Sequence, residues 1–302
     1  MLPGFYLHVH VQVHPVDGVD DPLSASLPKS IVKVSIETDE IEEQFPFSTV
    51  FDHVVDMEGL AWGPDAGATY MYVGDEYNYM YQMELATGNI SRQWDVGTAL
   101  GISTSDDKGI ESLTFSSASG TFFAGIQETA NIHEFSIDPA EDCTDACTVT
   151  EVSSFEIPES PSGMFYSEDE DFLYILCGTL TNGDQYLYVY TTTGTQECFI
   201  TIPEAVGLSR TDGFFIDAAA GVAYIADSQG PIYADDGSLG FNVYQVEWDN
   251  PCSTSAATAS DDGATADSPE GVAEAASGAD SIAFNSVSIA CALVAIVSML
   301  AF

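Results

Sequence analysis

The sequence predicts an all-β fold, a β-propeller, because short strand-like segments recur with a period of about 50 residues. Each repeat begins with a polar or acidic residue followed by a small one, and then continues through apolar segments separated by turn residues. The first segments of the four repeats begin near Glu58, Glu111, Ser162 and Asp212. Four-stranded sheets repeated around a central channel are the architecture that such a pattern is typical of.

The composition indicates a folded domain with a strongly acidic surface. Of the 302 residues, 45% are hydrophobic and 11% aromatic, which suffices for one large core. The chain has 48 acidic and 5 basic residues, a formal net charge of −43. This charge repels phosphate backbones and anionic lipid headgroups, so nucleic acid is excluded as a partner and cations are favoured. Solubility in a salty or calcium-bearing medium is the plainer alternative for the charge.

Residues 1–28 form a lead-in before the first complete repeat. Residues 5–14 alternate between apolar and polar, so His8, His10 and His14 would share one face of a strand. Three imidazoles on one face could hold a metal, whereas a strand that simply pairs with the sheet is the alternative. The start of the sequence lacks the basic and apolar segments of a secretory leader, which leaves either a missing leader or no export.

Residues 29–252 form the predicted propeller. Residues 30–47 match residues 79–96 and therefore look like the outer half of a blade. The last repeat has strand-like segments at 222–226 and 242–248 but no clear fourth strand. A propeller closes its ring by letting one blade take strands from both chain ends. We therefore expect five blades with a shared closure, or six if the start of the gene is lost.

The C-terminal part has two further segments. Residues 253–280 are Ser, Ala, Gly and acidic residues, which predicts a flexible stalk, and residues 281–302 are an apolar segment that ends the chain. No basic residue follows Arg210, so the basic flank of a spanning helix is missing. Small residues around Ser277 and Ala279, a polar spacer and an apolar tail favour a lipid-anchor (GPI) signal, and a tail-anchored helix is the alternative. We expect attachment to the extracellular cell surface, with membrane contact through this tail only.

The cysteines and one sequon add expectations about processing. Cys291 lies in the apolar tail, so the body has five cysteines and at least one of them is free or pairs elsewhere. Cys143 and Cys147 are predicted to form a disulfide in an enlarged hairpin turn. Cys177 and Cys198 fall on non-neighbouring strands of one blade and are not paired here, and the partner of Cys252 stays open.

Asn89-Ile90-Ser91 is an N-glycosylation sequon on a predicted hairpin turn between two strands. If the chain is secreted, this exposed position suits modification. The sequence then predicts a glycoprotein.

Acidic residues recur in register at one rim of the predicted propeller. The first and second strands of a blade are antiparallel, so the start of the first lies beside the end of the second. Crowded carboxylates raise one another's pKa or bind a cation, and hard oxygen ligands select calcium or magnesium. Acidic residues that merely solvate turns are the alternative. The predicted ligands are Glu58, Glu76 (or its neighbour Asp75), Glu111, Glu128, Asp212 and Asp227.

These motifs resemble the SdiA-regulated family of six-bladed propellers, whose repeats carry a Glu-Gly-Leu or Glu-Gly-Ile segment followed by an acidic strand end. The matching motifs are Met57-Glu58-Gly59-Leu60 with Gly74-Asp75-Glu76, Ile110-Glu111-Ser112-Leu113 with Gln127-Glu128, and, more weakly, Asp212-Gly213-Phe214. The resemblance covers roughly residues 30–248 and implies a calcium-binding propeller without a settled activity. The chain is more loosely similar to gluconolactonase-type propellers, whose asparagine ligands it lacks, and to esterase-like phytases.

The function expected from the sequence is a surface-anchored, calcium-binding propeller that acts as a binding or scaffold module for a small-molecule or protein ligand. The alternative is a metal-dependent hydrolase of a lactone or phosphoester at the channel mouth. The sequence leaves open whether the protein is an enzyme, because Gly-x-Ser-x-Gly, His-Glu-x-x-His and phosphate-loop motifs are absent. Of the two histidines in the body, His133 is expected to be a sheet residue and His53 to lie near the mouth.

Overall fold

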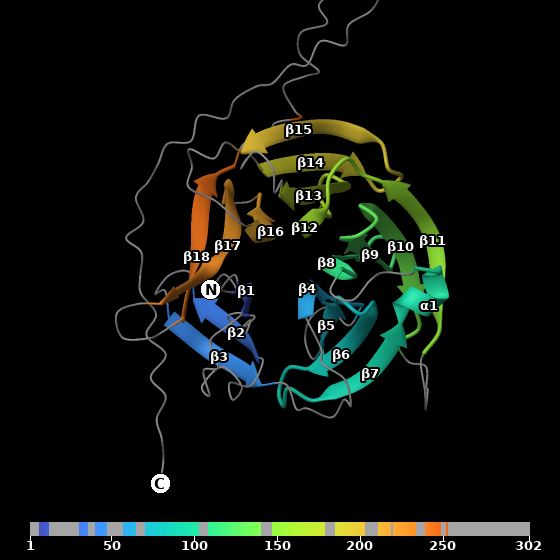
Figure 1. Cartoon of the computed structure of the whole chain (residues 1–302), viewed down its shortest axis with the longest axis horizontal. Coiled ribbons are helices and arrows are strands. Elements are labelled where there is room, and N and C mark those ends of the chain that lie inside the picture. Colours follow the sequence, from blue (N-terminus) through green and yellow to red (C-terminus); the bar gives the residue numbers. More distant parts are fainter. Residues whose placement is uncertain are drawn as a thin grey trace, which may run out of the picture.

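The structure is a computed structural model that describes residues 6–11, 30–35, 40–46, 57–64, 70–102, 108–139, 147–178, 185–202, 211–218, 220–233, 239–248 and 252. The described strands form five antiparallel sheets. These sheets are arranged in a ring, with the first strand of each nearest the centre (Figure 1). The predicted all-β propeller is confirmed.

The bounds of the strands follow the predicted repeats closely. The N-terminal sheet contains β1 (Tyr6–Val11), β2 (Ser30–Ser35) and β3 (Glu40–Pro46). The next sheet contains β4 (Met57–Trp62), β5 (Tyr70–Asp75), β6 (Tyr79–Glu84) and β7 (Ile90–Asp95), and helix α1 (Val96–Leu100) follows it. The third sheet contains β8 (Ile110–Ser116), β9 (Thr121–Ile126), β10 (Asn131–Ile137) and β11 (Val149–Glu156).

The remaining two sheets complete the set of described strands. One contains β12 (Pro161–Ser167), β13 (Phe172–Gly178), β14 (Gln185–Thr191) and β15 (Gln196–Ile202). The other contains β16 (Thr211–Asp217), β17 (Val222–Tyr233) and β18 (Leu239–Glu247). The four predicted repeats thus begin on β4, β8, β12 and β16, which we call the inner strands.

The N-terminal hairpin differs from the expected shared closure. Strands β2 and β3 form a sheet with β1, in which Tyr6 pairs with Ser35 and Val11 with Ser30, and not with β16–β18. The alternating segment of the lead-in supplies this extra strand, so the hairpin needs no strand from the other chain end. The sheet lies in the ring between β16–β18 and β4–β7 (Figure 1). His8 and His10 lie on β1, although nothing is described of their side chains. His14 lies outside the described residues.

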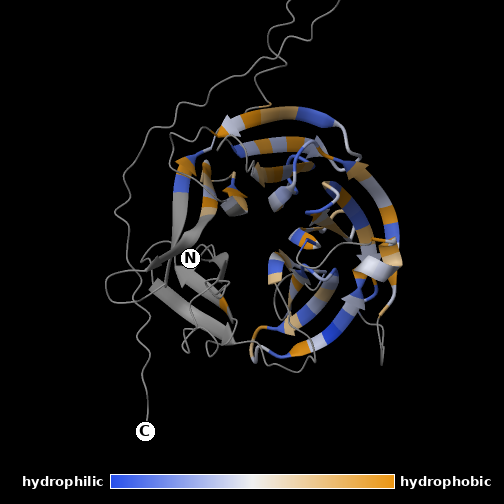
Figure 2. Ribbon diagram, in the orientation of Figure 1, coloured by the Kyte–Doolittle hydropathy of each residue, from blue (hydrophilic) through white to orange (hydrophobic). Residues whose placement is uncertain are grey.

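The core lies between adjacent sheets, because each blade packs its face against the next. Tyr72 of β5 contacts Phe122 of β9 with ring centroids 4.9 Å apart, and Trp94 and Phe135 complete the same cluster. Every residue of β9 is buried, since a second strand has a neighbouring blade on each face. Apolar residues accordingly recur along the strands of the coloured blades (Figure 2). Each large side chain buried in this way stabilises the fold by about 1.5–3 kcal/mol.

The inner strands approach one another so closely that a side chain is excluded at some positions. Strand β4 contacts β8, β8 contacts β12, and β12 contacts β16. A Cβ added at Gly59 would lie 2.7 Å from Leu113 Cβ and 2.8 Å from Leu113 N. A Cβ at Gly74 would lie 2.6 Å from Ile110 Cγ2. The glycine at position 59 therefore lets the backbones of β4 and β8 meet, and the glycine at position 74 makes room for the side chain of Ile110.

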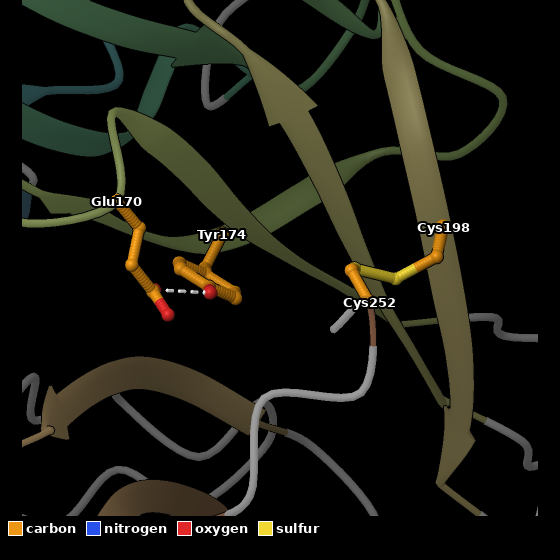
Figure 3. The surroundings of a disulfide bond; sticks show 4 residues. All are labelled: Glu170, Tyr174, Cys198 and Cys252. Atoms are coloured by element: carbon orange, nitrogen blue, oxygen red, sulfur yellow. Dashed lines mark hydrogen bonds between the residues drawn. A yellow bond between two sulfur atoms is a disulfide. The ribbon is translucent and has the colours of Figure 1, made fainter. Parts of the chain in front are cut away.

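A disulfide between Cys198 and Cys252 joins β15 to the chain that follows β18 (Figure 3). Close to it, Tyr174 packs edge-on against Trp248 at 5.4 Å and donates a hydrogen bond to Glu170. The bond crosslinks two successive blades across 54 residues of sequence, which restricts the unfolded chain.

The other described cysteines agree with the sequence-based expectations. Cys177 is free and buried, and it does not pair with Cys198, since β14 lies between their strands. Cys147 is disulfide-bonded, and its partner is not among the described residues, so the pair with Cys143 remains a prediction. Within the described ranges no helix has the length and hydropathy to cross a bilayer. The predicted stalk and anchor, residues 253–302, lie outside these ranges.

Gly59→Ala is expected to destabilise the protein by about 1–3 kcal/mol, because the new methyl group overlaps the backbone and side chain of Leu113. Gly178→Ala is the matched control, since a Cβ there meets no atom within 4 Å. Urea unfolding of both variants measures the difference. Equal stability of the two variants would contradict the close approach of β4 and β8.

Candidate metal-binding rim

The four inner strands share a β-bulge at the same position. The register of each inner strand shifts between the residue before the bulge and the residue after it: Met57 and Gly59, Ile110 and Ser112, Pro161 and Gly163, Thr211 and Gly213. The residues left out of the ladder are Glu58, Glu111, Ser162 and Asp212. A bulge bends its strand and re-aims the extra side chain, and bulges are over-represented beside functional sites. Three of the acidic residues singled out by the sequence, Glu58, Glu111 and Asp212, are thus bulged residues.

The bulged residues lie at one rim of the propeller, where the inner strands start and the second strands end. Glu58 is half-buried and Glu111 is 8% exposed. Gln127 Nε2 donates a hydrogen bond of 3.2 Å to Glu111 Oε1, which orients this carboxylate. The side chains of Asp212 and Asp227 fall outside the described residues, although Asp227 pairs with Thr211 in the ladder.

The register of the second strands shows that Glu76 and Glu128 do not occupy equivalent positions in their blades. Asp75 pairs with Met57 and Ile126 with Ile110, so the residue that corresponds to Glu76 is Gln127. Glu128 lies one residue further along, is exposed, and donates its backbone N–H to Lys108 O at 3.1 Å. Pairing Glu76 with Glu128 matches the two repeats by charge, whereas the ladder matches Gly74 with Gly125 and therefore Glu76 with Gln127. This glycine spacing was the signal that could have identified Gln127.

Asp75, the alternative partner of Glu58, holds a turn together. It is fully buried, and its Oδ1 accepts hydrogen bonds from the backbone N–H groups of Tyr77 (3.1 Å) and Tyr79 (2.8 Å). Its Oδ2 accepts a bond of 2.7 Å from the hydroxyl of Tyr81. Burial, together with the charge of Asp75, raises the pKa of Tyr81 above its ordinary value, so this hydroxyl remains a donor. Asp75 therefore stabilises the turn between β5 and β6.

Ser162 and Glu76 show how the rim is built between the acidic positions. The hydroxyl of Ser162, the bulged residue of the third repeat, donates a hydrogen bond of 3.2 Å to Leu176 O. The side chain of this bulged residue therefore bonds within its own blade. Glu76 is 8% exposed, and a Cβ at Gly109 would lie 2.1 Å from its carbonyl oxygen. Gly109 O also accepts from Gln127 N at 2.9 Å. The segment before β8 therefore runs between the ends of β5 and β9, next to both Glu76 and Gln127.

Two buried hydroxyls flank the bulged acids. Thr211, directly before Asp212, is 1% exposed, and Ser112, directly after Glu111, is 3% exposed. Neither hydroxyl oxygen has a hydrogen-bond partner among the described residues. Among the described side chains, which exclude those of Asp212 and Asp227, no group of three or more His, Cys, Asp or Glu is arranged to hold a metal. A site at this rim therefore requires Asp212 or another carboxylate from outside the described set.

His133 lies within the sheet, as expected. It is on β10, pairs with Ala124 and Ser154, and is 8% exposed. Its Nδ1 lies 3.3 Å from Glu151 Oε1 on the adjacent outer strand. This pair is on the third and fourth strands and not on the inner strands, and His53 falls outside the described residues.

No family model matches the chain, and no curated protein matches it. Similar solved structures include hydrazine synthase from Kuenenia stuttgartiensis, with a TM-score of 0.43 and 15% sequence identity. They also include the β-propeller domain of Myceliophteria thermophila Cps50 (Swd1), with a TM-score of 0.39 and 11% identity. The matches cover 72% and 78% of this chain but only 56% and 62% of those chains. At this level the similarity concerns the fold alone.

Asp75→Ala is expected to destabilise the protein by about 3 kcal/mol or more, because three donors lose a buried charged acceptor. Tyr81→Phe removes one of these bonds and should cost about 1.5–3 kcal/mol. Urea unfolding gives both values, and any calcium-dependent stabilisation should persist in both variants. An Asp75→Ala protein of unchanged stability that had lost its response to calcium would instead make Asp75 a ligand.

Proposed function

We propose that this protein is a calcium-binding β-propeller that acts as a binding module at the extracellular cell surface. Glu58, Glu111 and Asp212 hold the cation at the rim of the channel. The observation that carries the proposal is the bulge that recurs at the same position of four successive inner strands, with a carboxylate at three of them. A bulge interrupts the ladder of hydrogen bonds and re-aims the extra side chain. Because acidic residues recur at the bulge, these side chains are expected to share one role.

Electrostatics supports a cation at this position. The chain has 48 acidic and 5 basic residues, so carboxylates that converge on a channel have few basic partners anywhere in the sequence. Glu111 is nearly buried, and a buried carboxylate is expensive unless hydrogen bonds or a cation compensate its charge. Gln127 supplies a neutral donor to one oxygen of Glu111. A divalent ion shared between neighbouring blades would neutralise the bulged acids together.

The chemistry of the donors favours calcium over other ions. The rim offers carboxylates and the hydroxyl of Thr211, which are hard oxygen ligands. Calcium accepts six to eight oxygens in irregular geometry, whereas magnesium requires a near-ideal octahedron. The bulged residues come from separate blades and include one serine, so the coordination geometry they offer is irregular. Calcium tolerates such a geometry better than magnesium does. Glu76 and Asp227 are further candidate ligands. Glu128 is exposed and lies one residue beyond the position equivalent to Glu76, so its carboxylate would have to extend further to reach the ion.

The number of blades, the family relationship and the extracellular location belong to the same proposal. The five described sheets support a five-bladed ring, and the bulged Glu-Gly-Leu segment supports a relationship to the SdiA-regulated propellers. Disulfides persist in oxidising compartments, and both the Cys198–Cys252 bond and the disulfide-bonded Cys147 support an extracellular protein. The composition of residues 277–302, small residues followed by an apolar segment, supports the C-terminal lipid anchor that belongs to this proposal. The ligand of the module is a small molecule or a protein surface.

Chelation should lower the melting temperature of the wild-type protein, and calcium should restore it. At roughly a hundred times its dissociation constant, calcium stabilises the folded state by about 2.7 kcal/mol. The double variant Glu58→Gln, Glu111→Gln should lose this dependence. The control Glu156→Gln, Glu197→Gln removes two exposed acidic residues from outer strands and should keep it. Scanning calorimetry with and without chelator measures the shift.

Screening of surface charge is the rival explanation, and it would respond equally to sodium at matched ionic strength. A melting temperature that ignores the chelator, or that sodium restores as well as calcium does, would overturn the proposal. The same samples should be assayed with lactone and phosphoester substrates. Calcium-dependent turnover would favour the hydrolase alternative over the binding module.

A further inference from the structure

The sequence contains a single Asn-x-Ser/Thr motif, Asn89-Ile90-Ser91. It lies where β6 ends, turns and continues as β7, the outermost strand of the sheet. Of the rim acids, Glu58 lies on β4, the innermost strand of the same sheet. The motif is therefore separated from the proposed cation by the full width of a blade.

The backbone of Asn89 is committed to the turn, whereas its side chain is not. Asn89 O accepts a hydrogen bond from Glu84 N at 2.8 Å, and Asn89 N donates to the hydroxyl of Thr87 at 3.2 Å. The side chain is exposed, and its amide makes no hydrogen bond with the described part of the chain. A large hydrophilic group on this nitrogen would displace no contact of the fold.

The surroundings of the turn are also open to solvent. Ala86, Thr87 and Ser91 are exposed like Asn89 itself. The hydroxyl of Ser91 donates to Gln82 Oε1 at 2.7 Å after folding, along the flank of the hairpin. The turn joins β6 and β7, the two strands of the sheet that lie farthest from the centre of the ring (Figure 1), so a glycan there would stand away from the inner strands.

A second observation indicates the compartment in which such a modification takes place. The bond between Cys198 and Cys252 crosslinks two blades, and Cys147 is also disulfide-bonded. Structural disulfides persist in oxidising compartments, and in eukaryotic cells these include the secretory route, where the asparagine of a sequon is glycosylated. The equivalent hairpin of the third repeat, with Thr193 and Gly194 in its turn, has no asparagine and is not a competing acceptor.

We infer that Asn89 carries an N-linked glycan, attached through its side-chain amide nitrogen at the outer edge of the β4–β7 sheet. The inference rests on the proposed extracellular location but not on the proposed cation. The two are therefore tested by different readouts of the same protein.

The test expresses the full chain behind a secretory leader in eukaryotic cells and treats it with an asparagine-specific glycosidase. One downward shift in mass is expected, together with conversion of Asn89 to Asp in the corresponding peptide by mass spectrometry. Asn89→Gln and Ser91→Ala should each abolish the shift. Ser91→Thr preserves the sequon and Thr193→Ala changes only the equivalent turn, so both should keep it.

Secreted wild-type protein without a glycan at Asn89, or an identical shift in Asn89→Gln, would overturn the inference. The melting temperature of the deglycosylated protein with and without calcium is measured in parallel. Loss of calcium dependence there would count against the cation and would leave the glycan result unaffected.

Discussion

The close approach of the inner strands is the constraint on which the rest of the structure depends. Sheets that meet face to face around a centre must bring their first strands together, and β4 and β8 do so at Gly59, where a Cβ would overlap Leu113. At Gly213 the close contact lies within the blade instead, because a Cβ there would lie 3.2 Å from the Cβ of Ala226, its ladder partner on β17. Ser112 also faces its own ladder partner, because a Cβ on Gly125 of β9 would lie 2.4 Å from the Ser112 hydroxyl oxygen. The residue after each bulge is small: Gly59, Ser112, Gly163 and Gly213.

The acidic half of the motif has a different origin. The small residue is required by packing, but packing alone does not require the carboxylate before it. The bulge removes that residue from the ladder, which frees its side chain from the alternation of the strand. Glu58 and Glu111 occupy this position in neighbouring blades. Packing requires the small residue, and the proposed cation requires the carboxylate at the bulge. Together these two requirements explain why an acidic residue and a small one recur side by side along the chain.

Much of the fold was predictable because second strands such as β9 are buried on both faces and leave a continuous apolar run in every repeat. The pairing of β1 with β2 was not predictable, since alternation shows that a strand exists but not which strand it pairs with. The partner of Cys252 depends on contact between two blades, which no local pattern encodes. Within the site, the positions of Gln127 and Asp75 depend on strand register and on hydrogen bonds, which residue type alone does not encode.

Diffraction from crystals grown with calcium tests the central claim most directly, because anomalous scattering identifies the ion independently of stability. The account predicts one anomalous peak at the rim, within about 2.3–2.6 Å of carboxylate oxygens of Glu58, Glu111 and Asp212. The peak should be missing from crystals of the Glu58→Gln, Glu111→Gln variant. A well-ordered rim without a peak at millimolar calcium, or a peak held by other residues only, would contradict it.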